Sequence, residues 1–522
     1  MIQHLPILAI LIPLLSAIVL LRKREGVDPV RRTLSVATTA LLVVVAAWQL
    51  LKVAGGDILV YQLGNWSAPW GIVLVVDRLS ALMVLLTAVL ALFSLIHACS
   101  GEDREGSNFH GLFQLQLMGI NGAFLTGDLF NLFVFFEVLL LASYALLMHG
   151  GGRLRVQAGV HYVVLNLAGS ALFLIALGVL YGSLGTLNMA DMAEKVSDLP
   201  ADRQGLVRAG ALLLLVVFGL KAAMLPLYFW MPRAYSAAPA PVAALFSIMT
   251  KVGIYALLRV YTLIFGDQAG TLAGLALPWL WWSGLATLLV ALVAVLSARD
   301  LRVQIAYFML VSIGTLLCAL GMNSDQARAA LLFYLVHTTL LSGGLFLLAD
   351  LIADQRGKVG TRIARGRAFR YTTLLGALYL AGVVGVVGLP PLSGALAKAW
   401  LMSTASPAEA LWLWPLLLLA GLSGLVAASR AGSTLFWRHT DAEPSRTRLA
   451  RGKLIGALGL LAAAPLLVVF AGPIGGYTTA TAEQLHDTAR YRTAVLGQRD
   501  LERGLERALE VNQAPEAHAD AD

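Results

Sequence analysis

The sequence predicts an all-α polytopic membrane protein, and three features lead to this fold class. Of its 522 residues, 58% are hydrophobic and 13% are charged. The mean hydropathy is +0.78. A soluble domain usually carries about a quarter charged residues, so a water-soluble globular protein is excluded. The third feature is a series of apolar runs of about 20 residues, the length that a helix needs to cross a bilayer core.

We count fourteen such runs, and no part of the chain requires a strand. They cover residues 5–21, 34–53, 72–97, 109–126, 129–149, 159–185, 209–231, 240–265, 274–297, 302–321, 328–353, 372–404, 409–437 and 452–475. We expect the first run to be retained, because its basic cluster follows the apolar residues, whereas a signal peptide carries its basic residues first. Residues 478–522 interleave charged residues and predict a charged extramembrane tail with one helix.

The basic residues predict the orientation. The net charge of +8 comes from 38 basic and 30 acidic residues, and most basic residues fall in alternate loops. Loops rich in Lys and Arg stay in the cytoplasm, so an even number of spans places both termini outside. The loop around Glu102, Asp103 and Glu105 does not fit, because it is acidic on the predicted cytoplasmic side. Two distant cysteines give no disulfide framework, iron–sulfur or zinc motif.

Five ionisable residues lie inside the apolar runs: Glu137, Lys221, Lys251, His337 and Lys398. A charge at the bilayer centre costs about 2.5–3.5 kcal/mol on insertion scales, so each of these groups needs a function or a partner. A buried lysine can release its proton near neutral pH, whereas arginine cannot. The set therefore predicts proton handling. The alternative for each residue is a structural helix–helix contact.

Another buried basic residue, Arg259, follows Lys251 by two helical turns. It either pairs with an acid or extends to the membrane boundary, and the sequence favours the second. Asp77 and Arg78 begin an apolar run and are expected to be interfacial anchors.

Two apolar runs are interrupted by proline or glycine, and each also carries a buried lysine. Residues 209–231 contain Pro226, and residues 372–404 contain Gly388, Pro390 and Pro391. A backbone break at membrane depth survives only where protein or a water-filled cavity satisfies the freed groups. Two broken helices at corresponding positions indicate two structural repeats.

Four long stretches carry a resemblance to a known family. They are NGAFLTGDLFNLFVFFEVLLLASYALL, GLKAAMLPLYFWMPRAYSAAPAPVAALFSIMTKVGIYALLR, RDLRVQIAYFMLVSIGTLL and GLPPLSGALAKAWL. From about residue 70 to 475 the chain resembles the antiporter-like family shared by multisubunit cation/proton antiporters and proton-pumping membrane subunits of respiratory complex I. Within that family it is most similar to the D subunits of Mrp-type (Pha, Mnh) antiporters.

The resemblance implies a domain organisation of fourteen helices with two inverted five-helix repeats, each with a discontinuous helix. Residues 1–108 would hold three N-terminal helices, 109–265 and 274–437 the repeats, 452–475 the last helix and 478–522 the tail.

The resemblance also implies roles for the buried groups. Glu137 and Lys221 would form the charge pair of the first half-channel, and Lys251 the central connection. Lys398 would be the terminal lysine of the second half-channel, and His337 would lie between the two. Many relatives carry a lysine where this chain has Ser342, which leaves the second half-channel less defined.

The resulting hypothesis is a secondary transporter subunit and not an enzyme. It would move protons in a heteromeric Na⁺ or K⁺/proton antiporter of the bacterial inner membrane, with other subunits, these ions and the lipid bilayer as partners. We expect no cofactor, no metal site and no nucleic acid. The alternatives are a proton-pumping subunit of a complex I-like oxidoreductase or membrane-bound hydrogenase, and a scaffold whose charges only hold helices together.

Overall fold

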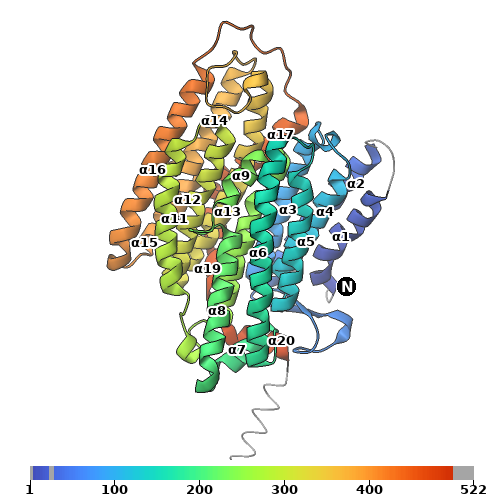
Figure 1. Ribbon diagram of the computed structural model, residues 1–522, viewed down its shortest axis with the longest axis vertical. Coiled ribbons are helices and arrows are strands. Elements are labelled where there is room, and N and C mark those ends of the chain that lie inside the picture. The colour runs from blue at the N-terminus through green and yellow to red at the C-terminus, as the bar shows by residue number, and fades with distance from the viewer. Residues whose placement is uncertain (1–3, 23–28, 498–522) are drawn as a thin grey trace, which may run out of the picture.

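The computed structural model describes residues 4–22 and 29–497, and it is a bundle of helices aligned with its long axis (Figure 1). The first half contains α1 (Leu5–Leu21), α2 (Pro29–Val53), α3 (Arg78–Ala98), α4 (Phe109–Leu125), α5 (Leu129–Leu147), α6 (Arg153–Leu184), α7 (Met189–Ser197), α8 (Ala201–Ala222), α9 (Trp230–Ala237) and α10 (Ala240–Leu263). The second half contains α11 (Leu277–Ser297), α12 (Leu301–Gly321), α13 (Asp325–Arg356), α14 (Thr372–Val387), α15 (Ser393–Ser403), α16 (Pro407–Phe436), α17 (Arg451–Leu461), α18 (Ala463–Val469), α19 (Ala471–His486) and α20 (Thr488–Leu496).

The prediction of an all-α polytopic membrane protein is confirmed. The described residues contain eleven helical segments that are long and apolar enough to cross a membrane. The other three predicted spans fall on α1, on α4 and on the pair α14–α15, which are shorter helices. The division into two inverted repeats stays a prediction, although α4–α10 and α11–α16 both contain a broken helix before their last helix.

Strands are present, which corrects one expectation. β1 (Leu59–Gln62) pairs antiparallel with β2 (Val73–Val76). The apolar residues of β2 join those of α3 in the sequence, so residues 72–97 resembled one continuous span. The boundary is Asp77, which caps α3 by accepting a hydrogen bond from the Ser80 backbone N–H at 2.9 Å. A capping carboxylate satisfies one of the free N–H groups at a helix start.

The last predicted span is also more complex than expected. Residues 452–475 fall on α17, α18 and the start of α19, and α19 continues to His486 before α20 begins. α19 packs against α13 and α10, so this segment belongs to the bundle. The charged stretch 501–510 of the predicted tail helix lies outside the described residues.

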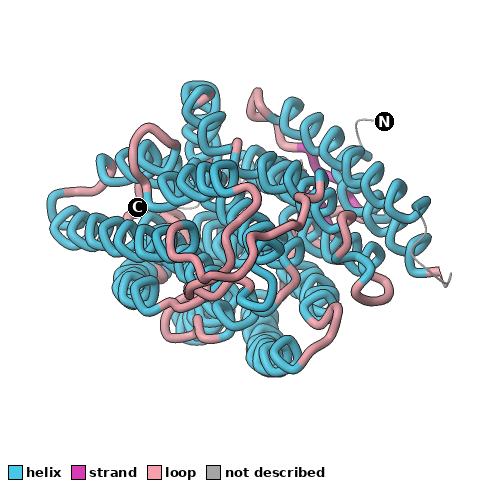
Figure 2. Tube along the Cα trace, turned by 90° about the horizontal axis from the view of Figure 1, so that it is seen from above, coloured by secondary structure: helices cyan, strands magenta, loops and turns pink. Residues whose placement is uncertain are grey.

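Both described ends of the chain lie near the β-hairpin end of the bundle. The rings of His4 and Tyr61 are 5.7 Å apart, and α20 packs against β1. The loop after α13 and the loop after α16, both rich in arginine, pair through Gly366 and His439 at the opposite end. Figure 2 shows loops crossing the helix ends when the bundle is seen from above. This arrangement fits termini on one side of the membrane, and the side itself stays a prediction.

The acidic loop that did not fit the orientation is explained by its contacts. Arg32 binds Asp103 through two hydrogen bonds of 2.6 Å, Lys453 lies 2.6 Å from Glu102, and Arg155 lies 3.1 Å from Glu105. Each carboxyl group of the loop is thus in contact with a basic side chain from a neighbouring helix at the same end. The local charge excess of the loop disappears once the helices are assembled.

Candidate functional site

The first part of the candidate site links Glu137 on α5 to Lys221 on α8 through two side chains of α6. The Lys221 ammonium donates to the Asn166 side-chain oxygen at 3.3 Å. One turn further along α6, the Ser170 hydroxyl donates a hydrogen bond to the Glu137 carboxylate. Asn166 and Ser170 lie on the same face because residues four apart are neighbours on a helix. The Ser170 hydroxyl also lies 3.1 Å from the Asn166 backbone carbonyl. Lys221 and Glu137 therefore contact neighbouring residues of α6 and do not pair directly.

The broken helix α8–α9 positions Lys221. α8 ends one residue after Lys221, where Ala223 adopts a left-handed conformation with φ of 60°. Polar partners satisfy the freed backbone groups: the Trp230 indole donates to the Leu220 carbonyl at 3.1 Å, and the Leu225 N–H donates to the Thr287 hydroxyl at 3.0 Å. The break predicted from Pro226 is therefore confirmed, and protein side chains form hydrogen bonds with backbone groups on both sides of it.

Lys251 lies on α10, which packs against both α8 and α13. Its side chain is 0% exposed, and its ammonium has no hydrogen-bond partner among the described residues. On the same helix, Gly253 lies directly against α8: a Cβ there would be 2.5 Å from the Ala222 backbone nitrogen. The close helix contact brings the backbone of α10 beside the end of α8, next to Lys221.

Other buried polar atoms near the middle of the chain also lack partners within residues 4–22 and 29–497. They are the Thr250 hydroxyl, the Tyr235 hydroxyl, the Gln116 side-chain oxygen and both polar atoms of the Gln304 amide. Buried polar groups are nearly always hydrogen-bonded in proteins, to protein or to ordered water. Thr250 is next to Lys251 in the chain and Gln116 contacts Met249 two residues before it, so the interior beside Lys251 is more polar than its apolar sequence suggests.

The second part of the candidate site joins His337 on α13 to the broken helix α14–α15. His337 Nδ1 lies 2.7 Å from the Ser393 hydroxyl at the start of α15. Five residues further along α15, the Lys398 ammonium donates to the Val387 carbonyl at the end of α14, at 2.6 Å. The structure thus brings His337 and Lys398 to the two sides of the second break. Lys398 follows its break, whereas Lys221 precedes the first one.

The two glycines that follow Ser342 have a packing explanation. Ser342 is buried on α13 and is followed by Gly343 and Gly344. A Cβ on Gly343 would lie 2.6 Å from the Leu90 side chain, and one on Gly344 would lie 3.0 Å from the Leu461 side chain. The two glycines let α3 and α17 approach α13 closely.

Sequence reasoning missed three residues and misjudged one. Asn166, Ser170 and Ser393 are neutral polar residues in apolar helices, and only their spacing to the breaks and to each other could have indicated them. The expectation for Arg259 is wrong: it does not extend to the boundary but forms a buried ion pair of 2.7 Å with Asp77. Asp77 is thus a buried partner of α10 as well as a helix cap.

A separate charged network lies at the arginine-rich end, where Lys453 bridges three carboxylates. Its ammonium lies 2.6 Å from Glu102, 2.7 Å from Asp350 and 2.9 Å from Asp354. Arg302 pairs with Asp350 at 2.9 Å. Burial, together with the Asp350 charge, raises the pKa of Glu102 to about 8 against the opposing effect of Lys453. With Glu102 protonated, two cations balance the two remaining carboxylates.

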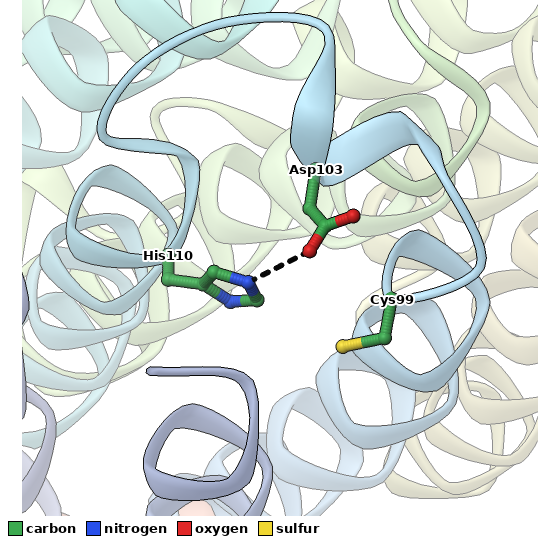
Figure 3. Close-up of side chains that lie close together, drawn as sticks. All are labelled: Cys99, Asp103 and His110. Atoms are coloured by element: carbon green, nitrogen blue, oxygen red, sulfur yellow. Dashed lines mark hydrogen bonds and ion pairs between the residues drawn. The ribbon is translucent and has the colours of Figure 1, made fainter. Parts of the chain in front are cut away.

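The structure also brings Cys99 together with Asp103 and His110, although the sequence shows no ligand motif there. Figure 3 shows His110 hydrogen-bonded to Asp103, with Cys99 across from them. Their potential ligand atoms lie within 4.8 Å of one another. Burial, with Asp103 nearby, raises the pKa of the Cys99 thiol to about 11. Since a metal needs a thiolate and Arg32 already neutralises Asp103, this group fits an ion-pair cluster better than a metal site.

Comparison with known proteins places this geometry in a family. Residues 126–423 match the family model described as NADH:quinone oxidoreductase/Mrp antiporter, transmembrane. The chain is 41% identical to the D subunit of a probable K⁺/H⁺ antiporter of Rhizobium meliloti, over 92% of this chain and 96% of that one. It is 35% identical to the D subunit of the Na⁺/H⁺ antiporter of Bacillus subtilis, over 94% and 99% of the two chains.

Solved structures agree with this assignment. A chain of the Mrp complex from Dietzia sp. DQ12-45-1b superposes with a TM-score of 0.83 at 27% identity, covering 95% of this chain and 99% of that one. A chain of an archaeal membrane-bound sulfane sulfur reductase superposes with a TM-score of 0.85 at 26% identity, covering 95% and 100%. The fold is therefore shared by antiporter and respiratory complexes.

The long apolar helices, together with the two helices broken beside a buried lysine, define a multi-pass membrane protein. The chain belongs to the NADH:quinone oxidoreductase/Mrp antiporter transmembrane family. Within that family it groups with the D subunits of Mrp-type antiporters, which it matches along nearly its whole length.

Proposed function

We propose that this protein is the proton-translocating D subunit of a heteromeric monovalent cation/proton antiporter. Protons would move along an axis formed by Glu137, which is only partly buried, and by the buried side chains of Lys221, Lys251, His337 and Lys398. Inward movement of protons would drive export of Na⁺ or K⁺. The similar D subunits carry both cations in their names, so their similarity supports monovalent cation exchange without selecting the ion.

The connection from Lys221 to Glu137 through Asn166 and Ser170 carries the proposal. Lys221 donates to the Asn166 side-chain oxygen, and the one hydroxyl proton of Ser170 can go either to the Glu137 carboxylate or to the Asn166 backbone carbonyl. Both ends of this connection are groups that can gain or lose a proton. A Lys–Glu pair used only to hold two helices together would gain most from direct contact. Separation by two neutral side chains instead leaves each charge incompletely neutralised and supports a transfer role.

The central step relies on Lys251. A buried ammonium without a protein partner is costly, because transfer of a charge out of water costs several kcal/mol even after relaxation. Such a group is stable only with water beside it or with its proton removed. Either condition suits a lysine that exchanges protons between two half-channels. The unpaired polar atoms of Thr250 and Gln116, which lie beside it, support a hydrated path.

The second half-channel would use His337, Ser393 and Lys398. The serine hydroxyl can donate or accept, and so it can connect the histidine ring to the start of α15 whichever tautomer is present. In place of the lysine that many relatives have, Ser342 offers a hydroxyl on the same helix, one turn and a half from His337.

The setting of the protein is part of the proposal. The Arg-rich loop end would face the cytoplasm of a bacterial cell, and both termini would be external. Other antiporter subunits would complete the transport unit, as the multisubunit Mrp complex among its structural neighbours suggests. A fluorescent-protein or phosphatase fusion to the C-terminus tests the orientation.

Proton exchange by the complete complex in inverted vesicles tests the function. A pH-sensitive dye reports dissipation of a preformed proton gradient after addition of NaCl or KCl. We expect Glu137→Ala and Lys221→Ala to abolish the response. Lys195→Ala is the matched control, because Lys195 is a half-exposed lysine on α7 that pairs with Asp191. Wild-type exchange by normally assembled Glu137→Ala or Lys221→Ala complexes would refute the proton path.

The same assay separates transport from a scaffold role. Lys398→Ala should lower turnover in complexes that assemble to the wild-type level. If it lowers assembly and the assembled fraction exchanges normally, the lysine is structural.

A further inference from the structure

A pocket lined by three arginines lies between α11, α16 and the loop that follows α13, away from the proton axis. Its volume is about 510 Å³, and its polar lining includes Arg299, Arg430, Arg438, Ser297 and Thr434. Within the described part of the chain, none of the three guanidinium groups forms an ion pair with a carboxylate. An unneutralised guanidinium favours phosphate, whose geometry matches its planar fork of donors.

Arg430 lies across the contact between two helices. It is exposed on α16, and its Nη2 donates to the Leu296 carbonyl near the end of α11 at 2.5 Å. This bond fixes one nitrogen of the guanidinium group and leaves the others able to donate. Arg438 follows α16 by two residues and lines the same pocket.

Exposed apolar side chains continue from this pocket along both helices. On α16 they occur four, eight, eleven and eighteen residues before Arg430, which is helical spacing on one face. They are Val426, Leu422, Leu419 and Trp412. On α11 the corresponding exposed residues are Val293, Leu289 and Trp282. The two rows run side by side, because α11 packs against α16 and the rings of Trp282 and Trp412 are 5.7 Å apart.

The length of this surface matches a bilayer. Arg430 and Trp412 are separated by about 27 Å along α16 at the helical rise per residue. The hydrocarbon core of a bilayer is about 30 Å thick. Tryptophan concentrates at membrane interfaces, so the tryptophan pair marks one interface and the arginine pocket lies at the other. A lipid headgroup at that depth would meet the arginines while its acyl chains follow the apolar rows.

We propose that the Arg299–Arg430–Arg438 pocket and the apolar rows of α11 and α16 form a binding site for an anionic phospholipid. Its phosphate would accept hydrogen bonds from Arg430 and Arg438, and its acyl chains would pack along the two rows. Basic pockets between transmembrane helices on the cytoplasmic side are suited to anionic headgroups. A zwitterionic lipid is disfavoured, because its ammonium would face three guanidinium groups.

Native mass spectrometry of the purified, delipidated antiporter complex tests this site. Dioleoylphosphatidylglycerol is titrated against dioleoylphosphatidylcholine and free glycerol phosphate. We expect the wild-type complex to retain the anionic lipid preferentially. The double change Arg430→Gln with Arg438→Gln should weaken its affinity about 25-fold, because each basic residue near an anionic lipid contributes about fivefold. The matched control is Arg446→Gln with Arg448→Gln, two exposed arginines of the loop before α17.

Four results would overturn the proposal. They are unchanged lipid affinity in the double variant, equal weakening in the control, equal binding of the zwitterionic lipid, and binding of glycerol phosphate as tight as that of the lipid. The variant Leu422→Cys tests for a protein occupant. A cross-link from this cysteine to another protein of the complex would also overturn the proposal, because a protein and not a lipid would then cover the apolar rows. If the double variant does not assemble, Arg438→Gln alone provides the comparison with about a fivefold effect.

Discussion

The contact of Gly253 with α8 makes one substitution a sharp test of how the lysines of the proposed proton axis are held in place. A Cβ at position 253 would lie 2.5 Å from the Ala222 nitrogen and 2.8 Å from the Lys221 carbonyl carbon. Ordinary contacts between such atoms are about 3.5–4.0 Å. Because these neighbours are backbone atoms, no side chain can turn away, and Gly253→Ala must separate α10 from α8 by about 1 Å.

Overpacking of this kind costs about 1–3 kcal/mol of folding free energy. The larger effect should be on exchange, because a displacement of about 1 Å in a reacting group can reduce a rate about a hundredfold. The shift would separate Lys251 from Lys221 without changing either residue. We therefore expect Gly253→Ala to lower the melting temperature of the complex moderately and to reduce proton exchange in the vesicle assay by at least about tenfold.

Gly178→Ala is the matched control. Gly178 is exposed on α6, and a Cβ there would meet nothing within 4 Å. Both changes remove the same helix penalty of glycine, about 1 kcal/mol, so their difference isolates the contact with α8. Wild-type melting temperature and wild-type exchange in Gly253→Ala complexes would refute the claim that this contact sets the lysine geometry.

Three further predictions concern polar contacts. Asn166→Ala should reduce exchange about tenfold or more in the vesicle assay, because a hydrogen bond to a charged group is worth about 1.5–3 kcal/mol; unchanged exchange would remove Asn166 from the path. Asp77→Asn should reduce the free energy of unfolding by about 3–5 kcal/mol and lower assembly of the complex, because it leaves Arg259 buried and unpaired. Adding Arg259→Met should restore assembly, measured by gel filtration. Folded Glu102 keeps a proton up to a pKa of about 8, whereas an unfolded Glu loses it near 4.5, so its contribution to stability falls as pH rises between these values. Glu102→Gln should flatten the melting temperature over that pH range, and an unaltered pH profile would contradict the raised pKa.

The helical elements could be predicted well because long apolar runs and proline breaks are local signals. The ionisable residues of the candidate site could also be predicted, because a charged residue inside an apolar run is identified from the sequence whatever the direction of its side chain. β2 was missed because its four apolar residues join α3 in the sequence. The cap formed by Asp77 and Ser80 is the local signal that separates them.

The connections between the groups could not be predicted, because they depend on the rotation of each helix about its axis. Asn166 and Ser170 differ little from other polar residues in the sequence, and only the packing of α6 against α5 and α8 gives them their partners. Arg259 shows the same limit. Its distance from Lys251 along α10 was clear, but Asp77 is 182 residues away in the chain.

The placement of the two lysines has a consequence for their electrostatics. Lys221 lies in the last turn of α8, and the Lys398 ammonium contacts a last-turn carbonyl of α14. The Lys398 ammonium therefore lies at the negative end of the α14 dipole, which stabilises a cation by about 0.3–1 kcal/mol or more where partly buried. The Lys221 ammonium instead contacts Asn166 on α6. The lysines come from opposite sides of their breaks, and they differ in the kind of oxygen that each ammonium contacts. The second break thus supplies an oxygen partner to its lysine from its own helix end, whereas the lysine of the first break depends on a side chain of α6.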